Sequence, residues 1–409
     1  MSATPSVPPE VEAFVLELVQ ALHRYGLPAY RIEDAMQRVG KRLGVELNVF
    51  SVPTGLTIGL GPLAEQRVRL LRVEPGSVRL ARIAELAELI EALAEGRLTT
   101  AQAHARLAAI EREPPVHGPE LTALAFALAS ATSSVFFGAH LAQAIVAGVI
   151  GALVGLLEIE AGRSDRLARL FEVLAAAAAA FLAGLATTLP LGVERDLLTL
   201  SAIIVLLPGY TLTVALNELA SGHLSSGTAR LGGVLATLFL LACGAAIGTT
   251  AADALLGVLP VSSAAARDPL GPAAPWFALL LAPLAYKVLF QARHRDTPWI
   301  VAAAVLAYLG GRLGQAAFGP LLGAGCGAFA LGLFSNLLAR RRLRPAAITA
   351  VPGLLVLVPG SVGFRGVTSF LAQDGTSGLE LVTRMLTIAM SLVCGLLLAS
   401  VVLPSRRTF

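Results

Sequence analysis

Ten apolar runs follow one another from residue 121 onward, and they constrain the fold more than any other feature of the chain. The runs are 121–138, 141–157, 170–189, 197–216 and 227–255, then 275–290, 298–309, 319–338, 347–362 and 379–403. Most of them approach the ~20 residues that a helix needs to cross a hydrocarbon core of about 30 Å. Charged residues make up only 14% of the chain, against about 25% in soluble domains. The sequence therefore predicts an α-helical polytopic membrane protein with about ten transmembrane helices.

The first 118 residues have a different character, because they hold much of the charge. Residues 1–120 carry 28 of the 58 charged side chains. Helical spacing predicts helices over 11–22, 32–43, 78–95 and 100–111, and alternating β-branched stretches predict strands over 45–52, 54–60 and 67–73. We expect a small α+β domain over 1–118, followed by membrane units over 119–258 and 272–404. Without a binding motif, the small domain is expected to be regulatory or to serve assembly.

The membrane part contains an internal repeat with an offset of 151 residues. Leu207-Pro208-Gly209 matches Val358-Pro359-Gly360, and Ser226-Gly227 matches Ser377-Gly378. The offset relates the first five apolar runs to the second five. Two similar units with an odd number of crossings must insert in opposite orientations, so the pattern predicts two inverted five-helix repeats.

The positions of the basic residues agree with this topology if the N-terminal domain is cytoplasmic. The expected inside loops and helix ends hold Arg163, Arg166, Arg169, Arg230, Lys287, Arg293, Arg295, Arg340, Arg341, Arg342, Arg344, Arg406 and Arg407. The expected outside segments hold Arg195, Arg267, Arg312, Arg365 and Arg384. An excess of Lys and Arg on the inside is the usual rule, so we expect a cytoplasmic C-terminus as well. Because this excess lies beside the bilayer, the pI of 9.2 does not indicate nucleic-acid binding.

The two repeated Pro-Gly pairs are the best candidates for a binding site. Pro208-Gly209 should break the fourth helix near mid-membrane, and Pro359-Gly360, helped by Pro352-Gly353, should break the ninth. Broken helices at corresponding positions of inverted halves are typical of transporter binding sites. Freed carbonyls could bind a cation or ammonium group, and freed N–H groups a carboxylate. The alternative is a pair of proline kinks that only serve packing.

Polar residues near the breaks complete the candidate substrate site. Its residues are Pro208, Gly209, Tyr210, Thr211, Thr213, Asn217, Glu218, Ser335, Asn336, Pro359, Gly360 and Ser361. A carboxylate at membrane depth is usually functional, but Glu218 lies toward the inner end of its helix, where an interfacial charge is an equal alternative. Serine and threonine in membrane helices commonly hydrogen-bond to neighbouring backbone instead of substrate.

Motifs for an enzyme or an ATP-driven machine are missing from the sequence. It contains no H-E-x-x-H, no G-x-S-x-G and no G-x-x-x-x-G-K-[ST] pattern. We therefore expect no catalytic residue, no metal and no cofactor, and a secondary gradient as the energy source.

Several motifs in a fixed order resemble the threonine/serine exporter family of bacterial membrane proteins. They are Ala21–Gly26, Pro53-Thr54-Gly55, Phe136-Phe137-Gly138, Pro208-Gly209-Tyr210, Ser225-Ser226-Gly227 with Arg230, Asn336 with Arg340, Arg344-Pro345, and Pro352–Gly360. The resemblance covers essentially the whole chain, with a soluble domain and five helices fused to a second five-helix unit.

The resemblance implies a secondary exporter of threonine and serine in the bacterial cytoplasmic (inner) membrane. The driving force would be the proton gradient or the membrane potential, with H⁺ as the expected coupling ion. Membrane lipids are the other expected partners, nucleic acid is not, and a homo-oligomer is left open. A dicarboxylate such as succinate is the alternative substrate. A membrane sensor or scaffold without transport is the alternative class.

Overall fold

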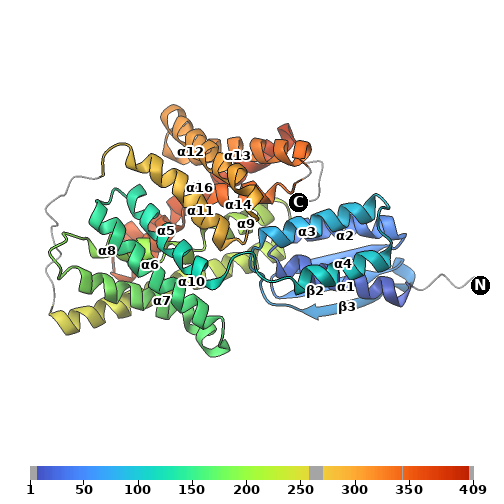
Figure 1. The fold of residues 1–409 in the computed structure, drawn as a ribbon, viewed down its shortest axis with the longest axis horizontal. Helices are drawn as coiled ribbons and strands as arrows, with labels where there is room; N and C mark the ends of the chain where they lie inside the picture. The colour runs from blue at the N-terminus through green and yellow to red at the C-terminus, as the bar shows by residue number, and fades with distance from the viewer. Residues whose placement is uncertain (1–6, 258–269, 343, 405–409) are drawn as a thin grey trace, which may run out of the picture.

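Two parts of different architecture lie next to each other along the longest axis of the molecule (Figure 1). The computed structural model describes residues 7–257, 270–342 and 344–404. The outer ends of the expected domains at 1–6 and 258, and Arg267, Arg406 and Arg407, lie outside the described residues. We refer to residues 7–118 as the N-terminal unit and to residues 119–404 as the bundle.

The N-terminal unit is a layer of four helices on a three-stranded antiparallel sheet, with strand order β1-β2-β3. Its elements are α1 (Pro9–Arg24), α2 (Ala29–Leu43), β1 (Leu47–Val52), β2 (Gly55–Leu60), η1 (Leu63–Glu65), β3 (Arg67–Arg72), α3 (Leu80–Ala94) and α4 (Thr100–Arg112). Helix α2 ends at Gly44, whose φ of 68° favours glycine. Helix α4 begins at a capping box between Thr99 and Gln102. The predicted small α+β fold is confirmed.

The bundle is helical throughout its described residues. Its elements are α5 (Pro119–Phe136), α6 (Leu141–Ala161), α7 (Asp165–Ala186), α8 (Arg195–Ala202), η2 (Ile204–Leu206), α9 (Gly209–Ala220), α10 (Leu224–Leu256), α11 (Ala274–Leu289), η3 (His294–Asp296), α12 (Thr297–Phe318), α13 (Pro320–Arg342), α14 (Ala347–Leu355), α15 (Gly360–Leu371) and α16 (Gly375–Val402). Each of the ten apolar runs corresponds to one helix or to one bent pair of helices.

The bundle has the length and the surface of a membrane protein. Among its described residues, six helices are long and apolar enough to cross a bilayer, or up to eight if the bent pairs α8–α9 and α14–α15 each count as one span. Helix α11, with 16 residues, is shorter. Helix α6 exposes Ile145, Val149, Leu153 and Leu156 at helical spacing along one face, and such an apolar surface requires a lipid or protein neighbour. A polytopic helical membrane protein is confirmed, and the ten crossings and their inverted arrangement remain a prediction.

Helix α12 is longer than predicted. The apolar run 298–309 ends where Gly310, Gly311 and Arg312 follow, but the helix continues to Phe318. A Cβ at Gly310 would lie 3.0 Å from Ala330 Cβ of α13. The glycines let α12 and α13 approach closely, and this close packing compensates for their poor helix propensity.

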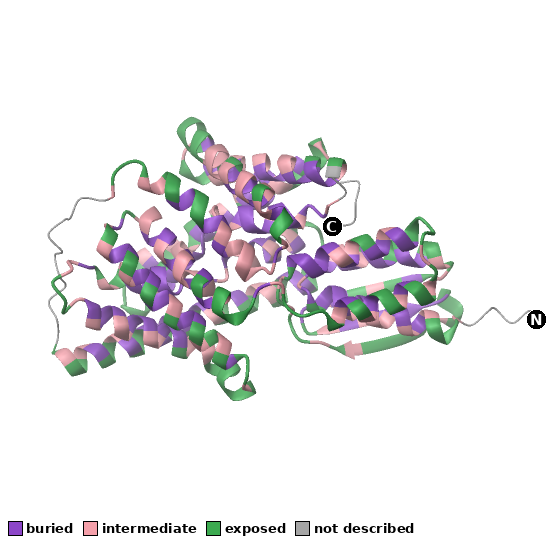
Figure 2. Cartoon of the chain, in the orientation of Figure 1, coloured by how far each residue is buried: buried purple, intermediate pink, exposed green. Residues whose placement is uncertain are grey.

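The N-terminal unit shares its hydrophobic core with the bundle. Phe14 and Leu22 belong to the same cluster of buried residues as Ile300, Ile348 and Val351. Buried positions accordingly continue from one part into the other in Figure 2. Separating the two parts would therefore expose apolar surface to water, which is unfavourable.

Candidate functional site

Both predicted helix breaks are present. Helices α8 and α9 are bent by 52° across η2, and α14 and α15 are bent by 42°. Pro208 is the N-cap residue of α9, and Pro359 is the N-cap residue of α15. Pro352 lies inside α14, three residues before the helix ends at Leu355. The break itself falls between Leu355 and Gly360, and the expected help from Pro352-Gly353 stays a prediction.

The two breaks meet each other. A Cβ built on Gly209 would collide with Val358 Cγ1, and it would lie 3.1 Å from the backbone N of Gly360. A Cβ built on Gly360 would lie 3.1 Å from Leu207 Cβ and 3.4 Å from the backbone N of Gly209. The offset of 151 exchanges the two halves of this contact, because it relates Leu207 to Val358 and Gly209 to Gly360. Such reciprocal contacts are characteristic of two elements related by a twofold axis.

The helices that begin at the breaks leave backbone donors free. Leu212 N–H already bonds to Pro208 O, and Val362 N–H bonds to Pro359 O. Within the described part of the chain, the N–H groups of Tyr210, Thr211 and Ser361 donate no hydrogen bond outside their own helices. The first N–H groups of a helix have no partner inside it. Two helix N-termini, each with the positive end of its dipole, are thus brought together at one place.

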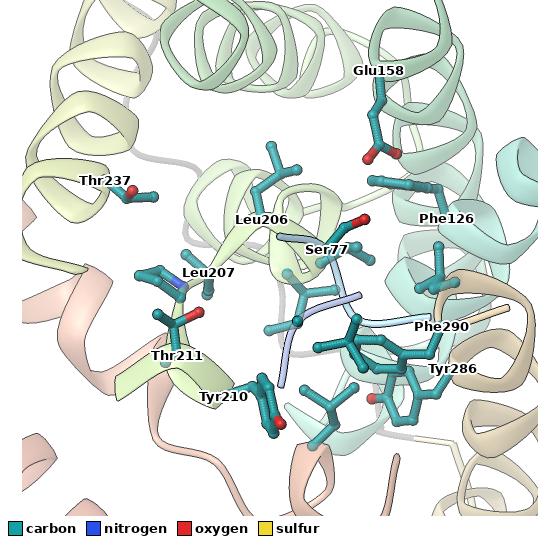
Figure 3. Close-up of a pocket in the computed structure, with 18 of the residues that line it drawn as sticks. Ser77, Phe126, Glu158, Leu206, Leu207, Tyr210, Thr211, Thr237, Tyr286 and Phe290 are labelled. Atoms are coloured by element: carbon teal, nitrogen blue, oxygen red, sulfur yellow. The ribbon is translucent and has the colours of Figure 1, made fainter. Parts of the chain in front are cut away.

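A cavity of about 830 Å³ lies against this meeting point. Of the candidate residues, Pro208, Tyr210, Thr211, Gly360 and Ser361 line it. Figure 3 shows Tyr210, Thr211 and Leu207 on one side of the cavity and Phe126 and Glu158 across it. Its volume is within the range of small-molecule sites, which is about 300–1,000 Å³. The arrangement is suited to an anionic group, because free N–H donors and helix dipoles attract negative charge.

The N-terminal unit closes part of the same cavity. Gly26 and the segment 76–79 line it together with bundle residues. Figure 3 shows Ser77 among the side chains that line the cavity. A ligand that enters from this side would have to pass the N-terminal unit.

Candidate residues, Tyr210 again among them, also line a second, smaller cavity of about 200 Å³. They are Tyr210, Thr213, Asn217, Ser335 and Asn336. Their polar atoms are largely used: Thr213 Oγ1 donates to Gly209 O, and Asn336 Nδ2 donates to Leu403 O at 2.9 Å. Ser335 Oγ accepts from Thr349 Oγ1 at 2.9 Å. Asn217 Oδ1 is a buried acceptor without a hydrogen bond in the described part of the chain, so the smaller cavity keeps a free acceptor.

Glu218 lies in the contact between the two parts of the molecule, and its side chain is 0% exposed. Oε1 accepts the backbone N–H of Ala29 at 2.9 Å, at the N-terminus of α2. Oε2 accepts from Ser226 Oγ at 2.7 Å and from Arg230 Nε at 3.0 Å. Glu218 is not among the residues that line either of the two cavities. The carboxylate thus holds a helix of the N-terminal unit on the bundle.

A second set of bonds fixes α3 on the turn that follows α11. The backbone N–H groups of Leu80 and Ala81 donate to Phe290 O at 2.9 Å and Gln291 O at 3.1 Å. Arg293 pairs with Glu85 and Glu88 at 3.0 Å each. The first N–H groups of α3 thus donate to carbonyl groups at the end of α11, so groups that have no partner inside their own helix satisfy each other.

Two buried histidines lie close to these contacts. Burial lowers the pKa of His23, and the nearby Arg230 guanidinium lowers it further. Burial also lowers the pKa of His117, whose Nε2 lies 3.0 Å from Ala292 O. Both side chains are therefore less readily protonated here than in water.

Sequence reasoning missed Glu158, which lines the large cavity from α6. The apolar run predicted for this helix ended at Leu157, so the carboxylate fell one residue beyond it. The signal that could have found it is that α6 continues to Ala161 and places Glu158 inside a candidate membrane span.

Comparison with known proteins gives two matches to family models. A model described as "Putative threonine/serine exporter" matches residues 13–252, and one described as "Threonine/Serine exporter, ThrE" matches residues 276–402. The boundary between the two matches, at residues 253–275, coincides with the boundary between the two predicted five-helix units.

Relatives occur in fungi and bacteria. The chain is 24% identical to "Pheromone-regulated membrane protein 10" of Eremothecium gossypii, over 89% of the chain and 50% of the relative. It is 24% identical to the protein of the same name from Yarrowia lipolytica, over 87% of the chain and 30% of the relative. It is 27% identical to "Probable threonine/serine exporter" of Mycobacterium tuberculosis, over 86% of the chain and 68% of the relative. The chain thus spans half or less of the length of these two fungal relatives. No solved structure shows a significant match.

Proposed function

We propose, since the chain belongs to the threonine/serine exporter family, that it is a secondary exporter of small polar amino acids. The observation that carries the proposal is the meeting of two helix N-termini at the wall of the 830 Å³ cavity. A scaffold or sensor does not need such a site. The family is one of transporters and not of enzymes.

The substrate carboxylate would bind at the breaks. The free N–H groups of Tyr210, Thr211 and Ser361 supply donors, and the dipoles of α9 and α15 add positive potential. The hydroxyl groups of Thr211 and Ser361 belong to the same residues as two of these donors, and they would hydrogen-bond to the hydroxyl group of threonine or serine. Discrimination by such groups is effective, because a site built to hydrogen-bond a hydroxyl is left unsatisfied when the hydroxyl is missing.

A dicarboxylate is the second candidate substrate, and one observation favours it. Two helix N-termini border the same cavity, so each could bind one carboxylate of a molecule such as succinate. Transport into proteoliposomes of labelled threonine, serine and succinate, under an imposed gradient, separates the alternatives. Movement of threonine or serine supports the first proposal, and movement of succinate alone supports the second. If none of the three moves, both fail.

We propose the inverted topology with ten crossings for the same chain, with membrane units over 119–258 and 272–404 and the domain 1–118 in the cytoplasm. Three findings support it: the offset of 151, the reciprocal contact of the breaks and the inside excess of basic residues. In this topology, Gly222, before α10, lies inside and Gly375, at the start of α16, lies outside. Single cysteines at these two positions should react with membrane-impermeant reagent from opposite sides. Labelling of both from one side would overturn the inverted repeat.

The location and energy source complete the proposal. We place the protein in a bacterial cytoplasmic membrane, with its N-terminal unit and C-terminus on the cytoplasmic side. Export would be driven by the proton gradient or the membrane potential, with H⁺ as the coupling ion.

A further inference from the structure

Glu158 is an acidic residue of the bundle that lines the large cavity. It lies on α6, three residues before the helix ends at Ala161, within a candidate membrane span. Among the residues that the structure describes, no hydrogen bond or ion pair reaches its carboxylate. By contrast, Glu160 on the same helix pairs with Arg163, and Glu218 pairs with Arg230.

The carboxylate points into the large cavity. Figure 3 shows the oxygens of Glu158 beside the Phe126 ring, across the cavity from Tyr210 and Thr211. A carboxylate within a membrane span is costly and commonly marks an ion or proton pathway. Because Glu158 faces the breaks from the opposite wall, it shares the cavity with the proposed substrate site without belonging to it.

The other charged and titratable groups around the cavity leave Glu158 free to change its protonation state. They are Arg79, Arg163, Glu172, Tyr210, Arg230 and Tyr286. Arg163 and Arg230 are already paired with Glu160 and Glu218. A carboxylate fixed to an arginine resists protonation, because the opposite charge stabilises its ionised form. Neither Glu158 nor Glu172 has such a partner among the described residues, and Glu158 is the one whose carboxylate Figure 3 shows directed into the cavity.

We propose that Glu158 carries the proton that is exchanged for substrate. When the cavity opens to the outside, one carboxylate oxygen accepts a proton from water. When the cavity opens to the cytoplasm, the same O–H bond breaks and the proton returns to water there. No bond to substrate forms or breaks. This inference rests on the proposed export function and identifies the residue that couples it to the proton gradient.

The test compares two transport modes in proteoliposomes for the wild-type protein, Glu158→Gln and Glu160→Gln. Counterflow of labelled against unlabelled threonine requires binding and alternating access but no net proton movement. Accumulation driven by an imposed pH difference also requires coupling. With one proton per substrate, a difference of one pH unit supports about tenfold accumulation.

We expect Glu158→Gln to retain counterflow within about twofold of the wild-type rate and to lose the tenfold accumulation. Glu160→Gln should retain both, because its carboxylate is exposed and lies outside the cavity lining. Glu158→Asp, which restores a carboxylate, should recover part of the accumulation. Proton-driven accumulation by Glu158→Gln at the wild-type level would overturn the inference. Loss of counterflow as well, in folded protein, would also overturn it, because Glu158 would then serve binding or structure.

A measurement without transport keeps this inference distinct from the export proposal. Infrared difference spectra between about pH 8 and pH 5 report protonation of carboxyl groups. The wild-type protein should show a carboxyl signal that is missing from Glu158→Gln and present in Glu160→Gln. An unchanged signal in Glu158→Gln would contradict the inference even if threonine is exported. If the signal behaves as expected but no substrate moves, the export proposal fails alone.

Discussion

Replacing Glu218 by Gln should loosen the N-terminal unit from the bundle. The carboxylate is 0% exposed and accepts hydrogen bonds from Ala29 N–H, Ser226 Oγ and Arg230 Nε. The amide keeps the shape of the side chain but removes the charge and one acceptor. The Arg230 guanidinium, 18% exposed, then lacks its counter-charge.

The magnitude follows from these contacts. Hydrogen bonds to charged groups contribute about 1.5–3 kcal/mol each, and breaking a buried pair costs about 3–5 kcal/mol. Because Arg230 is partly exposed and the amide can still accept one bond, we expect a loss of about 2–4 kcal/mol. The exposed pair of Glu160 and Arg163 provides the control, since such pairs contribute about 0–1 kcal/mol.

Hydrogen exchange at the first turn of α2 measures the effect. Ala29 N–H is bonded directly to Glu218, so its protection depends on the docked state. A loss of 2–4 kcal/mol corresponds to about 30- to 900-fold faster exchange. Glu160→Gln should leave this exchange rate within about fivefold of wild type. If Glu218→Gln folds and exchanges Ala29 at the wild-type rate, the carboxylate does not hold the two parts together.

Two further predictions concern the breaks and pH. Gly209→Ala should reduce export by about 5- to 150-fold, because its Cβ would collide with the stiff Val358 side chain and overpacking costs about 1–3 kcal/mol. Gly360→Ala should reduce export less, because the nearest contact of its Cβ would be at 3.1 Å. A larger loss of transport in Gly360→Ala than in Gly209→Ala would contradict this geometry. Because burial lowers the pKa of His23 and His117 from 6.5, the folded protein binds protons at these sites more weakly than the unfolded chain, so stability is lost as the pH falls below 6.5. The temperature of the thermal unfolding midpoint should therefore decrease when the pH is lowered from about 7 to about 5. An increase in this temperature would refute the prediction.

Much of the fold could be predicted because it depends on local sequence. The strands and helices of the N-terminal unit follow hydrophobic periodicity, and glycines such as Gly44 mark their ends. The breaks at Pro208 and Pro359 follow from the missing N–H of proline. Helix α12 was predicted too short because Gly310 and Gly311 interrupt its hydropathy while its hydrogen bonding continues.

The contacts between distant segments could not be predicted in the same way. Glu218 and Ala29 are 189 residues apart, and no periodicity indicates that one caps the helix of the other. Its position near the inner end of a helix fitted an interfacial charge equally well. Glu158 was missed for a related reason, because its significance comes from the cavity wall it faces and from the pairing of the arginines around it.

The central claim is that the two Pro-Gly breaks form the substrate site, and export by four backbone variants tests it most directly. Gly209→Leu and Gly360→Leu add a branched side chain where the breaks meet, and Pro208→Ala and Pro359→Ala allow the helices to straighten. We predict that all four variants insert and fold but lose export of threonine and serine, measured with matched amounts of protein. Wild-type export rates in all four would show that the breaks are packing kinks, and the site would then have to be sought at Ser335 and Asn336.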